Sequence, residues 1–226
     1  KILAALHDKD GKVTIPGFYD GVNPLPAATR KQWQSLKFSE KKFMGDVGLS
    51  VPAGEKGKSV LEQIWARPTA EVNGIWGGYT GSGAKTVLPS KADAKLTFRL
   101  VGQQNPAKIL KSFQKFVKDL LPKDCKVEFS GHGGGAPASE ISEDNVYIKK
   151  SAAALKAEFN RTPVLMGSGG SIPIVRNFKD ILGMDSVLVG FGLNDDAIHS
   201  PNEKYNLGSF QRGIRSWVRI MGALAE

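Results

Sequence analysis

The segment around His199 holds the densest set of side chains that could do chemistry. Asp195 and Asp196 precede the histidine, and Asn202 and Glu203 follow it. An imidazole can bind a metal or move a proton near neutral pH, although a single histidine in a polar loop is also a common surface residue. A tight metal site needs three or four ligands, and the chain contains neither a His-x-Asp motif nor a Glu-Glu pair. The sequence therefore predicts the edge of an active site that this chain does not complete alone.

Arg99 is a candidate for binding a carboxylate. Residues 94–101 alternate between apolar and polar side chains, which predicts a strand with Arg99 on its polar side. An arginine fixed on a strand can hold a carboxylate through two parallel hydrogen bonds, and a solvated arginine is the alternative.

Two glycine-rich segments and one histidine could also contact a ligand. Residues 78–86 have the wrong spacing for a phosphate-binding loop, so we expect a flexible hairpin connection in which Thr86 could face a ligand. Gly170 and Ser171 precede a predicted helix whose first free N–H groups suit a carboxylate or oxyanion, although an ordinary helix cap has the same pattern. His132 lies in a run of glycines, where hinge, substrate-contact and surface roles all remain open.

The elements that must position these residues fall into two groups. Strands are predicted over 72–79, 94–101 and 126–130, with a helix from Asn105-Pro106 to Leu121, after a helical pattern in the first residues that lacks a cap. This order is that of a ferredoxin-like sandwich without its first strand. The glycine run that begins at residue 131 predicts a boundary between domains 1–130 and 131–226.

The second group predicts an α/β arrangement. Helices are expected over 145–159, after Ser171 and near the C-terminus, and the apolar run 187–191 predicts a strand buried on both faces. His199 follows that strand, where open α/β sheets place their ligands. The last helix is expected to carry five apolar residues at helical spacing: Phe210, Ile214, Trp217, Val218 and Met221.

Composition narrows the class of protein. The formal charge is +9, but the basic residues are spread along the chain, which favours a diffuse field that attracts anions over a nucleic-acid interface. No apolar run reaches the length of a membrane span. Cys125 is the single cysteine, so a disulfide framework is excluded and a cytoplasmic location is expected, although a periplasmic protein without disulfides has the same composition.

Taken together, five segments in a fixed order resemble the dizinc aminoacylase and carnosinase-like metallopeptidases, and within them the carnosinase-type dipeptidases. These relatives of acetylornithine deacetylase and succinyl-diaminopimelate desuccinylase have a catalytic domain interrupted by a dimerising lid. The matching segments are residues 81–89, 98–101, 131–134, 169–173 and 197–203.

The resemblance implies roles for the candidate residues in an enzyme with two Zn²⁺ ions that hydrolyses a dipeptide or an N-acyl amino acid. It implies that His199 binds zinc, that Arg99 grips the substrate carboxylate beside Gly170 and Ser171, and that His132 contacts substrate or stabilises the tetrahedral intermediate. It also implies that Thr86 reaches the active site of the partner subunit in a homodimer.

Two departures from the family pattern qualify these roles. Residues 167–168 are Gly-Ser where the carnosinase type has Thr-Arg-Glu before its paired glycines, so contacts to substrate are expected to differ. The other metal ligands and the catalytic glutamate are expected in a segment before Lys1, so the chain alone is expected to be inactive. A non-catalytic dimerisation or scaffold module derived from this family is the alternative.

Overall fold

The computed structural model describes residues 1–131, 135–169 and 172–225. The chain divides into two compact units. Unit 1 contains Lys1–Ala138 together with Met166–Ser171, and unit 2 contains Ser139–Leu165 together with Ile172–Glu226. The mixed helix and strand content confirms the predicted α/β class.

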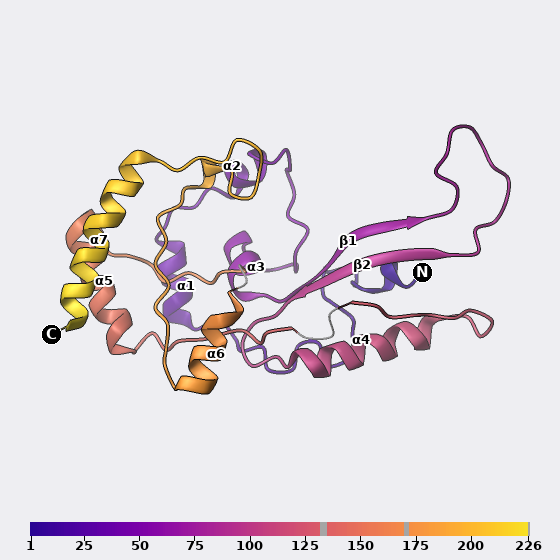
Figure 1. Cartoon of the computed structure of the whole chain (residues 1–226), viewed down its shortest axis with the longest axis horizontal. Coiled ribbons are helices and arrows are strands. Elements are labelled where there is room, and N and C mark those ends of the chain that lie inside the picture. The colour runs from indigo at the N-terminus through magenta and orange to yellow at the C-terminus, as the bar shows by residue number, and fades with distance from the viewer. Residues whose placement is uncertain (132–134, 170–171, 226) are drawn as a thin grey trace. The chain divides into compact units, whose positions relative to one another are not determined.

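Unit 1 is built on an antiparallel hairpin and one long helix. Strands β1 (Thr69–Gly77) and β2 (Ala92–Arg99) pair from Thr69 opposite Arg99 to Gly77 opposite Ala92, with a bulge between Val72 and Gly74. Helix α4 (Pro106–Leu120) lies alongside the hairpin, as Figure 1 shows. The predicted cap is present, because the Asn105 side chain accepts a hydrogen bond from the Lys108 backbone N–H at 3.0 Å.

The core of unit 1 lies between this helix, the hairpin and the first residues of the chain. The predicted first helix is a single 3-10 turn, η1 (Leu3–Ala5), and the chain then forms a bridge between His7 and Val13. Aromatic rings from three elements meet edge to face, with centroids of Phe98 and Phe113 5.2 Å apart. The hydrophobic core cluster of unit 1 consists of eight buried side chains among the described residues: Leu6, Val13, Ile15, Phe18, Ala70, Ile109, Phe113 and Val117.

The predicted strand over residues 126–130 is wrong, because this segment forms no strand pairing in the described part of the chain. Its side chains nevertheless pack as the alternation predicts. Val127 contacts the core, and the ring of Phe129 lies 6.3 Å from that of Phe113. Alternation records which side chains are turned inward, but a strand also needs a neighbouring strand to accept its hydrogen bonds.

Three short helices complete unit 1: α1 (Ala27–Gln34), α2 (Glu40–Gly45) and α3 (Val60–Ala66). Helix α3 starts with a capping box, in which Ser59 and Glu62 exchange hydrogen bonds with each other's backbone N–H groups. Trp33 of α1 and Trp65 of α3 meet edge to face with centroids 5.1 Å apart. These contacts hold the irregular first third of the chain together.

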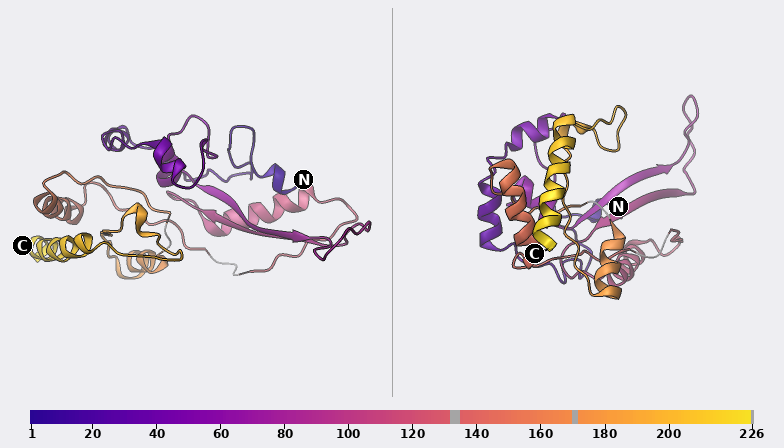
Figure 2. Two further views of the ribbon diagram at one scale, coloured as in Figure 1. Left: turned by 90° about the horizontal axis from the view of Figure 1, so that it is seen from above. Right: turned by 60° about the vertical axis from the view of Figure 1, so that its left-hand side comes forward.

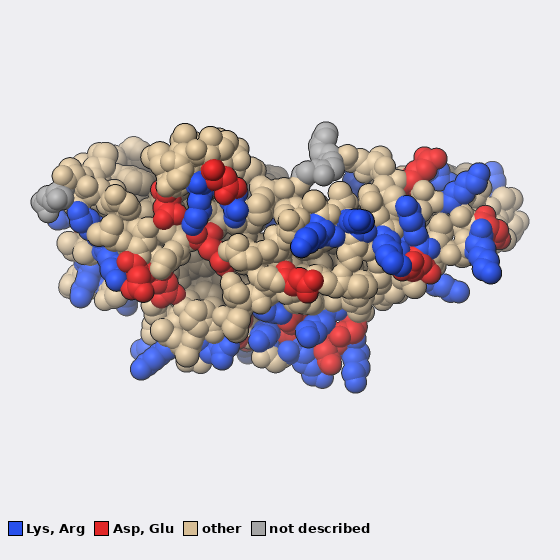
Figure 3. Space-filling view, turned by 90° about the horizontal axis from the view of Figure 1, so that it is seen from below, with Lys and Arg blue, Asp and Glu red and all other residues tan. Residues whose placement is uncertain are grey.

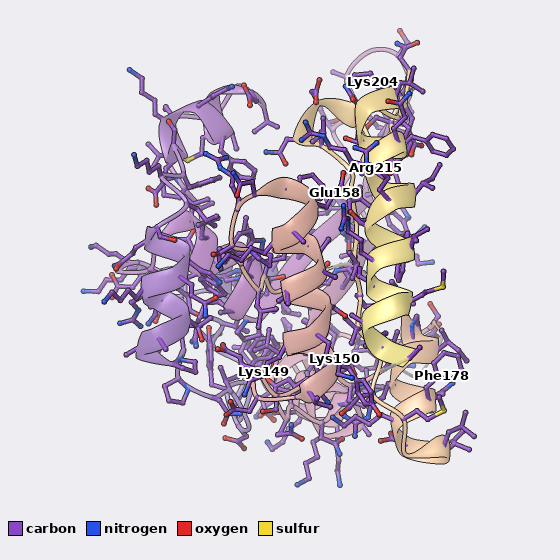
Figure 4. The ribbon with its side chains drawn as sticks, turned by 90° about the vertical axis from the view of Figure 1, so that its left-hand side faces the viewer. Lys149, Lys150, Glu158, Phe178, Lys204 and Arg215 are labelled. Atoms are coloured by element: carbon purple, nitrogen blue, oxygen red, sulfur yellow. The ribbon has the colours of Figure 1, made fainter. Side chains whose placement is uncertain are left out.

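Unit 2 contains helices α5 (Val146–Phe159), α6 (Pro173–Leu182) and α7 (Leu207–Ala225), with the short 3-10 turn η2 (Asn194–Asp196). Helices α5 and α7 lie side by side in both views of Figure 2. Glu158 of α5 binds Arg215 at 2.7 Å and Arg219 at 3.2 Å, and Figure 4 shows Glu158 and Arg215 meeting between the two helices.

One prediction about unit 2 is wrong. Residues 187–191 pair with no strand in the described part of the chain, and Leu188 is 63% exposed. Helix α7 forms where predicted. Its buried residues are Gly213, Ser216 and Ile220, and a side-chain carbon at Gly213 would lie 3.1 Å from the ring of Phe191. The apolar residues that the sequence places at helical spacing on α7 are exposed: Phe210, Ile214, Trp217, Val218 and Met221.

Candidate functional site

Arg99 lies at the end of β2, where it pairs with Thr69 across the hairpin. Its side chain is exposed, and it makes no hydrogen bond or ion pair with the residues that the structure describes. The strand fixes the backbone of Arg99 while its guanidinium keeps its donors for a ligand. The geometry thus agrees with what a carboxylate clamp requires.

Thr86 is exposed in the long connection between β1 and β2, which projects beyond the hairpin in Figure 1. Tyr79 organises the start of this connection, because its hydroxyl donates to the Ser82 carbonyl at 3.0 Å and Lys85 lies over its ring at 5.3 Å. Thr86 lies in the connection that enters β2 at Ala92, whereas Arg99 is the last residue of the strand, which itself spans roughly 20 Å at about 3.3 Å a residue. The structure does not bring these two residues together.

His199 lies in unit 2, in an exposed loop that follows η2. The loop is anchored by Asp196, whose side chain is 1% exposed and whose Oδ2 accepts from the Leu193 N–H at 2.7 Å. Lys204 closes the loop, because its backbone N–H donates to the Asp196 carbonyl at 2.9 Å and its Nζ lies 3.2 Å from Asp196 Oδ1. Lys204 precedes the first residue of α7 in the chain, and Figure 4 labels it near that end of the helix.

The backbone of this loop is strained. Ala197, His199 and Asn202 have φ angles of 52°, 64° and 62°, in the left-handed region that residues other than glycine rarely adopt. Each such conformation costs an L-residue roughly 1 kcal/mol. Strain of this kind persists only where surrounding contacts impose it, and it concentrates at functional sites.

Electrostatics reinforce the closure of the loop. Hydrogen bonds from Lys204 to Asp195 and Asp196 hold the pKa of the Lys204 ammonium above its usual value. Asp195 lies 2.9 Å from Lys204 Nζ, so one cation serves both carboxylates. An open hollow of about 490 Å³ borders the loop. It is lined by Phe191, Gly192, Asp196, Ile198, Glu203, Lys204 and Tyr205.

Three predicted site residues, His132, Gly170 and Ser171, lie outside the described residues. The helix predicted after Ser171 is present as α6, with Pro173 at its first position. Its N-cap, Ile172, makes no side-chain capping bond. The anion site proposed for this helix start remains a prediction.

The donor set of this chain does not make a metal site by itself. Within residues 1–131, 135–169 and 172–225, no group of three or more His, Cys, Asp or Glu side chains is placed to hold a metal ion. His199 offers one exposed imidazole, and the nearest buried carboxylate in its loop, Asp196, is already bound to Lys204. A single imidazole does not hold zinc tightly.

Sequence reasoning identified His199 but missed the pair that closes its loop. Asp196 was noted only as a polar neighbour, and Lys204 was not singled out. The sequence offers no local signal for this pair, because the loop closes through left-handed residues at Ala197 and His199 that no glycine marks.

Comparison with known proteins defines the class of the chain. Residues 1–125 match the peptidase dimerisation domain of M20 peptidases, and the chain belongs to this family. The match covers the hairpin, α4 and the core of unit 1.

Individual relatives cover both units. The chain is 33% identical over 221 residues to the Cys-Gly metallodipeptidase DUG1 of Candida albicans, covering 96% of this chain and 45% of the relative. It is 25% identical over 228 residues to the Beta-Ala-His dipeptidase of Homo sapiens, covering 100% of this chain and 46% of the relative. An M20 family metallo-carboxypeptidase, Sso-CP2 of Sulfolobus solfataricus, superposes with a TM-score of 0.83 at 26% identity, over 97% of this chain and 50% of that one. The chain spans about half the length of the curated relatives it matches.

Proposed function

We propose that these 226 residues form the dimerising lid and part of the catalytic domain of a metal-dependent dipeptidase. The observation that carries the proposal is the similarity to a Cys-Gly metallodipeptidase, which extends over 96% of the chain and therefore includes both units. In this assignment residues 1–130 are the lid and residues 131–226 belong to the catalytic domain.

Arg99 is assigned to the substrate's free carboxylate. The assignment is supported by its place at the end of a paired strand and by the absence of a partner for its guanidinium among the described residues. A dipeptide and an N-acyl amino acid both end in a carboxylate, and a guanidinium recognises this group through two parallel hydrogen bonds. Gly170 and Ser171 are assigned to the same end of the substrate, and His132 to the carbonyl that is attacked.

Thr86 is assigned to the active site of a partner subunit. The roughly 20 Å span of β2 argues against a shared site for Thr86 and Arg99 within one chain, and the family match is to a dimerisation domain. A homodimer would allow the β1–β2 connection of one subunit to complete the site of the other.

His199 is assigned as one ligand of a site for two Zn²⁺ ions, whose other ligands come from outside these 226 residues. The ions would supply Lewis acidity toward the scissile carbonyl and an activated water. The role of this chain is to present the imidazole from a loop with a fixed backbone. We expect the 226-residue chain by itself to be inactive, because it offers only one ligand among its described residues.

The test is to assay hydrolysis of Cys-Gly and β-Ala-His, with added Zn²⁺, by the 226-residue chain and by the full product of its gene. The expected result is no activity for the first and metal-dependent activity for the second. His199→Ala should abolish the activity and lower the bound metal, while the control His7→Ala, at an exposed histidine of unit 1, should change neither. Full activity in His199→Ala would contradict the proposal.

A non-catalytic dimerisation module is the second candidate. Two observations favour it: the family match is confined to the dimerisation domain, and the described residues contain no metal-binding group. The full gene product would then dimerise without hydrolysing either dipeptide, and it would be indifferent to His199→Ala.

A further inference from the structure

The loop from Asp196 to Lys204 is closed at both ends by a single pair of residues. Asp196 ties the loop to the preceding turn through the Leu193 N–H at 2.7 Å, and it accepts from the Lys204 backbone at 2.9 Å and from Lys204 Nζ at 3.2 Å. One residue thus uses both of its carboxylate oxygens and its carbonyl to fix the loop. We call this set of contacts the Asp196–Lys204 latch.

The latch encloses a backbone that would otherwise relax. Ala197, His199 and Asn202 are all left-handed, and the bonds inside the loop are few. Ser200 donates to the Ala197 carbonyl at 2.9 Å, whereas the His199 N–H reaches Glu203 Oε2 only at 3.4 Å. Glu203 also donates to the Ser200 carbonyl at 3.3 Å, so short-range bonds hold the inside of the loop while the contacts of Asp196 with Lys204 close it from outside.

The loop also packs against Gly192. A side-chain carbon added to Gly192 would lie 3.2 Å from Ile198 Cδ1 and 3.8 Å from Asp196 Oδ2. Ile198, the residue before His199, therefore packs against Gly192, next to the buried carboxylate of Asp196. The Asp196 side chain thus anchors the loop and also lies next to the position where Ile198 packs.

We propose that Asp196 and Lys204 are positioning residues that fix the backbone of His199 and so preset the place of its imidazole. The inference rests on the proposed function and deepens it, because it explains how this chain holds the backbone of a metal ligand in place. Asp195 shares Lys204 but is 74% exposed, so it supports the lysine and does not anchor the loop. The buried Asp196 carries the closure.

The test uses nuclear magnetic resonance of the 226-residue chain labelled in its three histidines and its backbone. Lys204→Met should speed hydrogen exchange at the backbone amides of residues 200 and 204 by about tenfold and shift the imidazole signals of His199. Lys204→Arg should restore both readouts, because it keeps the charge. The matched control is Lys149→Met, which removes an exposed ion pair with Asp144 and should leave the loop unchanged.

The outcomes separate the latch from the proposed function. Unchanged exchange and unchanged His199 signals in Lys204→Met would overturn the latch. Asp196→Asn should behave like Lys204→Met, and if it fails to fold, the lysine pair of variants decides the matter alone. Retention of metal by His199→Ala in the full gene product would defeat the metal role of His199 while leaving the latch intact.

Discussion

Arg67 and Arg99, both in unit 1, differ in whether their guanidinium groups have a partner. Arg67 is committed, because its guanidinium binds the buried Glu55 carboxylate at 2.9–3.0 Å and lies 5.2 Å from the ring centre of Tyr19. Arg99 has no partner among the described residues. The first arrangement stabilises the fold, and the second keeps donors available for a ligand.

Arg99→Ala should lower kcat/KM of the full gene product on a dipeptide by about 10- to 100-fold, because hydrogen bonds to a charged group contribute roughly 1.5–3 kcal/mol. Most of the loss should appear in KM, since the carboxylate is bound equally in ground and transition states. Steady-state kinetics measure this, and Lys95→Ala on the same strand face is the control. Equal effects of both variants would count against the clamp.

Arg67→Ala should destabilise the chain by about 3 kcal/mol, because it leaves the Glu55 carboxylate buried without its partner. Urea unfolding followed by tryptophan fluorescence measures the change. Arg161→Ala removes an exposed arginine and should stay within about 0.5 kcal/mol of the unchanged protein. A loss below 1 kcal/mol at Arg67 would show that water or another cation compensates Glu55.

Tyr19 makes stability depend on pH at the alkaline end. Burial, followed by its hydrogen bond with Glu55, raises the pKa of Tyr19 from 10.0 to about 12, so the folded state favours the protonated phenol. Its contribution to stability is therefore complete below pH 10 and is lost as pH rises from about 10 to about 12. The difference in unfolding free energy between the unchanged protein and Tyr19→Phe should shrink over that range.

At the scale of elements, hydrophobic periodicity predicted local structure well and pairing badly. The helix that became α4 could be predicted from its cap, its proline and its apolar stripe, because all three signals are local. The strands expected over 126–130 and 187–191 did not form, since a strand depends on a neighbour that the local sequence does not specify.

The same limit applied to the candidate site. Arg99 could be placed on a strand because alternation is local, and His199 could be noticed from its residue type. The contacts of Asp196 with Lys204 could not be predicted, since they depend on left-handed residues at Ala197 and His199 that carry no glycine as a marker.

Helix α4 packs an aromatic side chain, Phe113, into the core beside the hairpin. Phe113 is 9% exposed and meets the rings of Phe98 and Phe129. Phe113→Ala should therefore cost about 3–5 kcal/mol, through lost burial and the cavity that remains. Thermal or urea unfolding measures it, with Leu120→Ala, at a position 42% exposed on the same helix, as a control of much smaller effect.

At the scale of the whole molecule, charge and apolar surface are distributed differently. Figure 3 shows Lys and Arg side chains recurring along one face with Asp and Glu between them, which is consistent with the diffuse positive field expected from the sequence. No helix in the described part of the chain is both long and apolar enough to cross a bilayer. The large exposed apolar side chains of unit 2 gather on α6 and α7, among them Ile181 and Val218.

These exposed apolar faces should make the 226-residue chain self-associate, because contiguous apolar surface favours contact between molecules. The double variant Ile181→Lys with Val218→Lys should reduce the associated fraction in sedimentation velocity. Its unfolding free energy should change by no more than about 1 kcal/mol, since both side chains are exposed, at 77% and 63%. The paired control Lys149→Ala with Lys156→Ala alters charge on α5 and should leave association unchanged. An unaltered sedimentation profile in the apolar variant would exclude these faces as the cause.

The left-handed backbone around His199 also determines how this loop can vary between proteins. At Ala197 and Asn202 the conformation is one that glycine and asparagine adopt at least cost, so homologous chains can exchange these residue types there without altering the loop. β-branched residues are disfavoured at the same positions, however well they suit the surrounding surface. Structures of related chains should therefore share the backbone conformation of this segment at positions where their side chains differ.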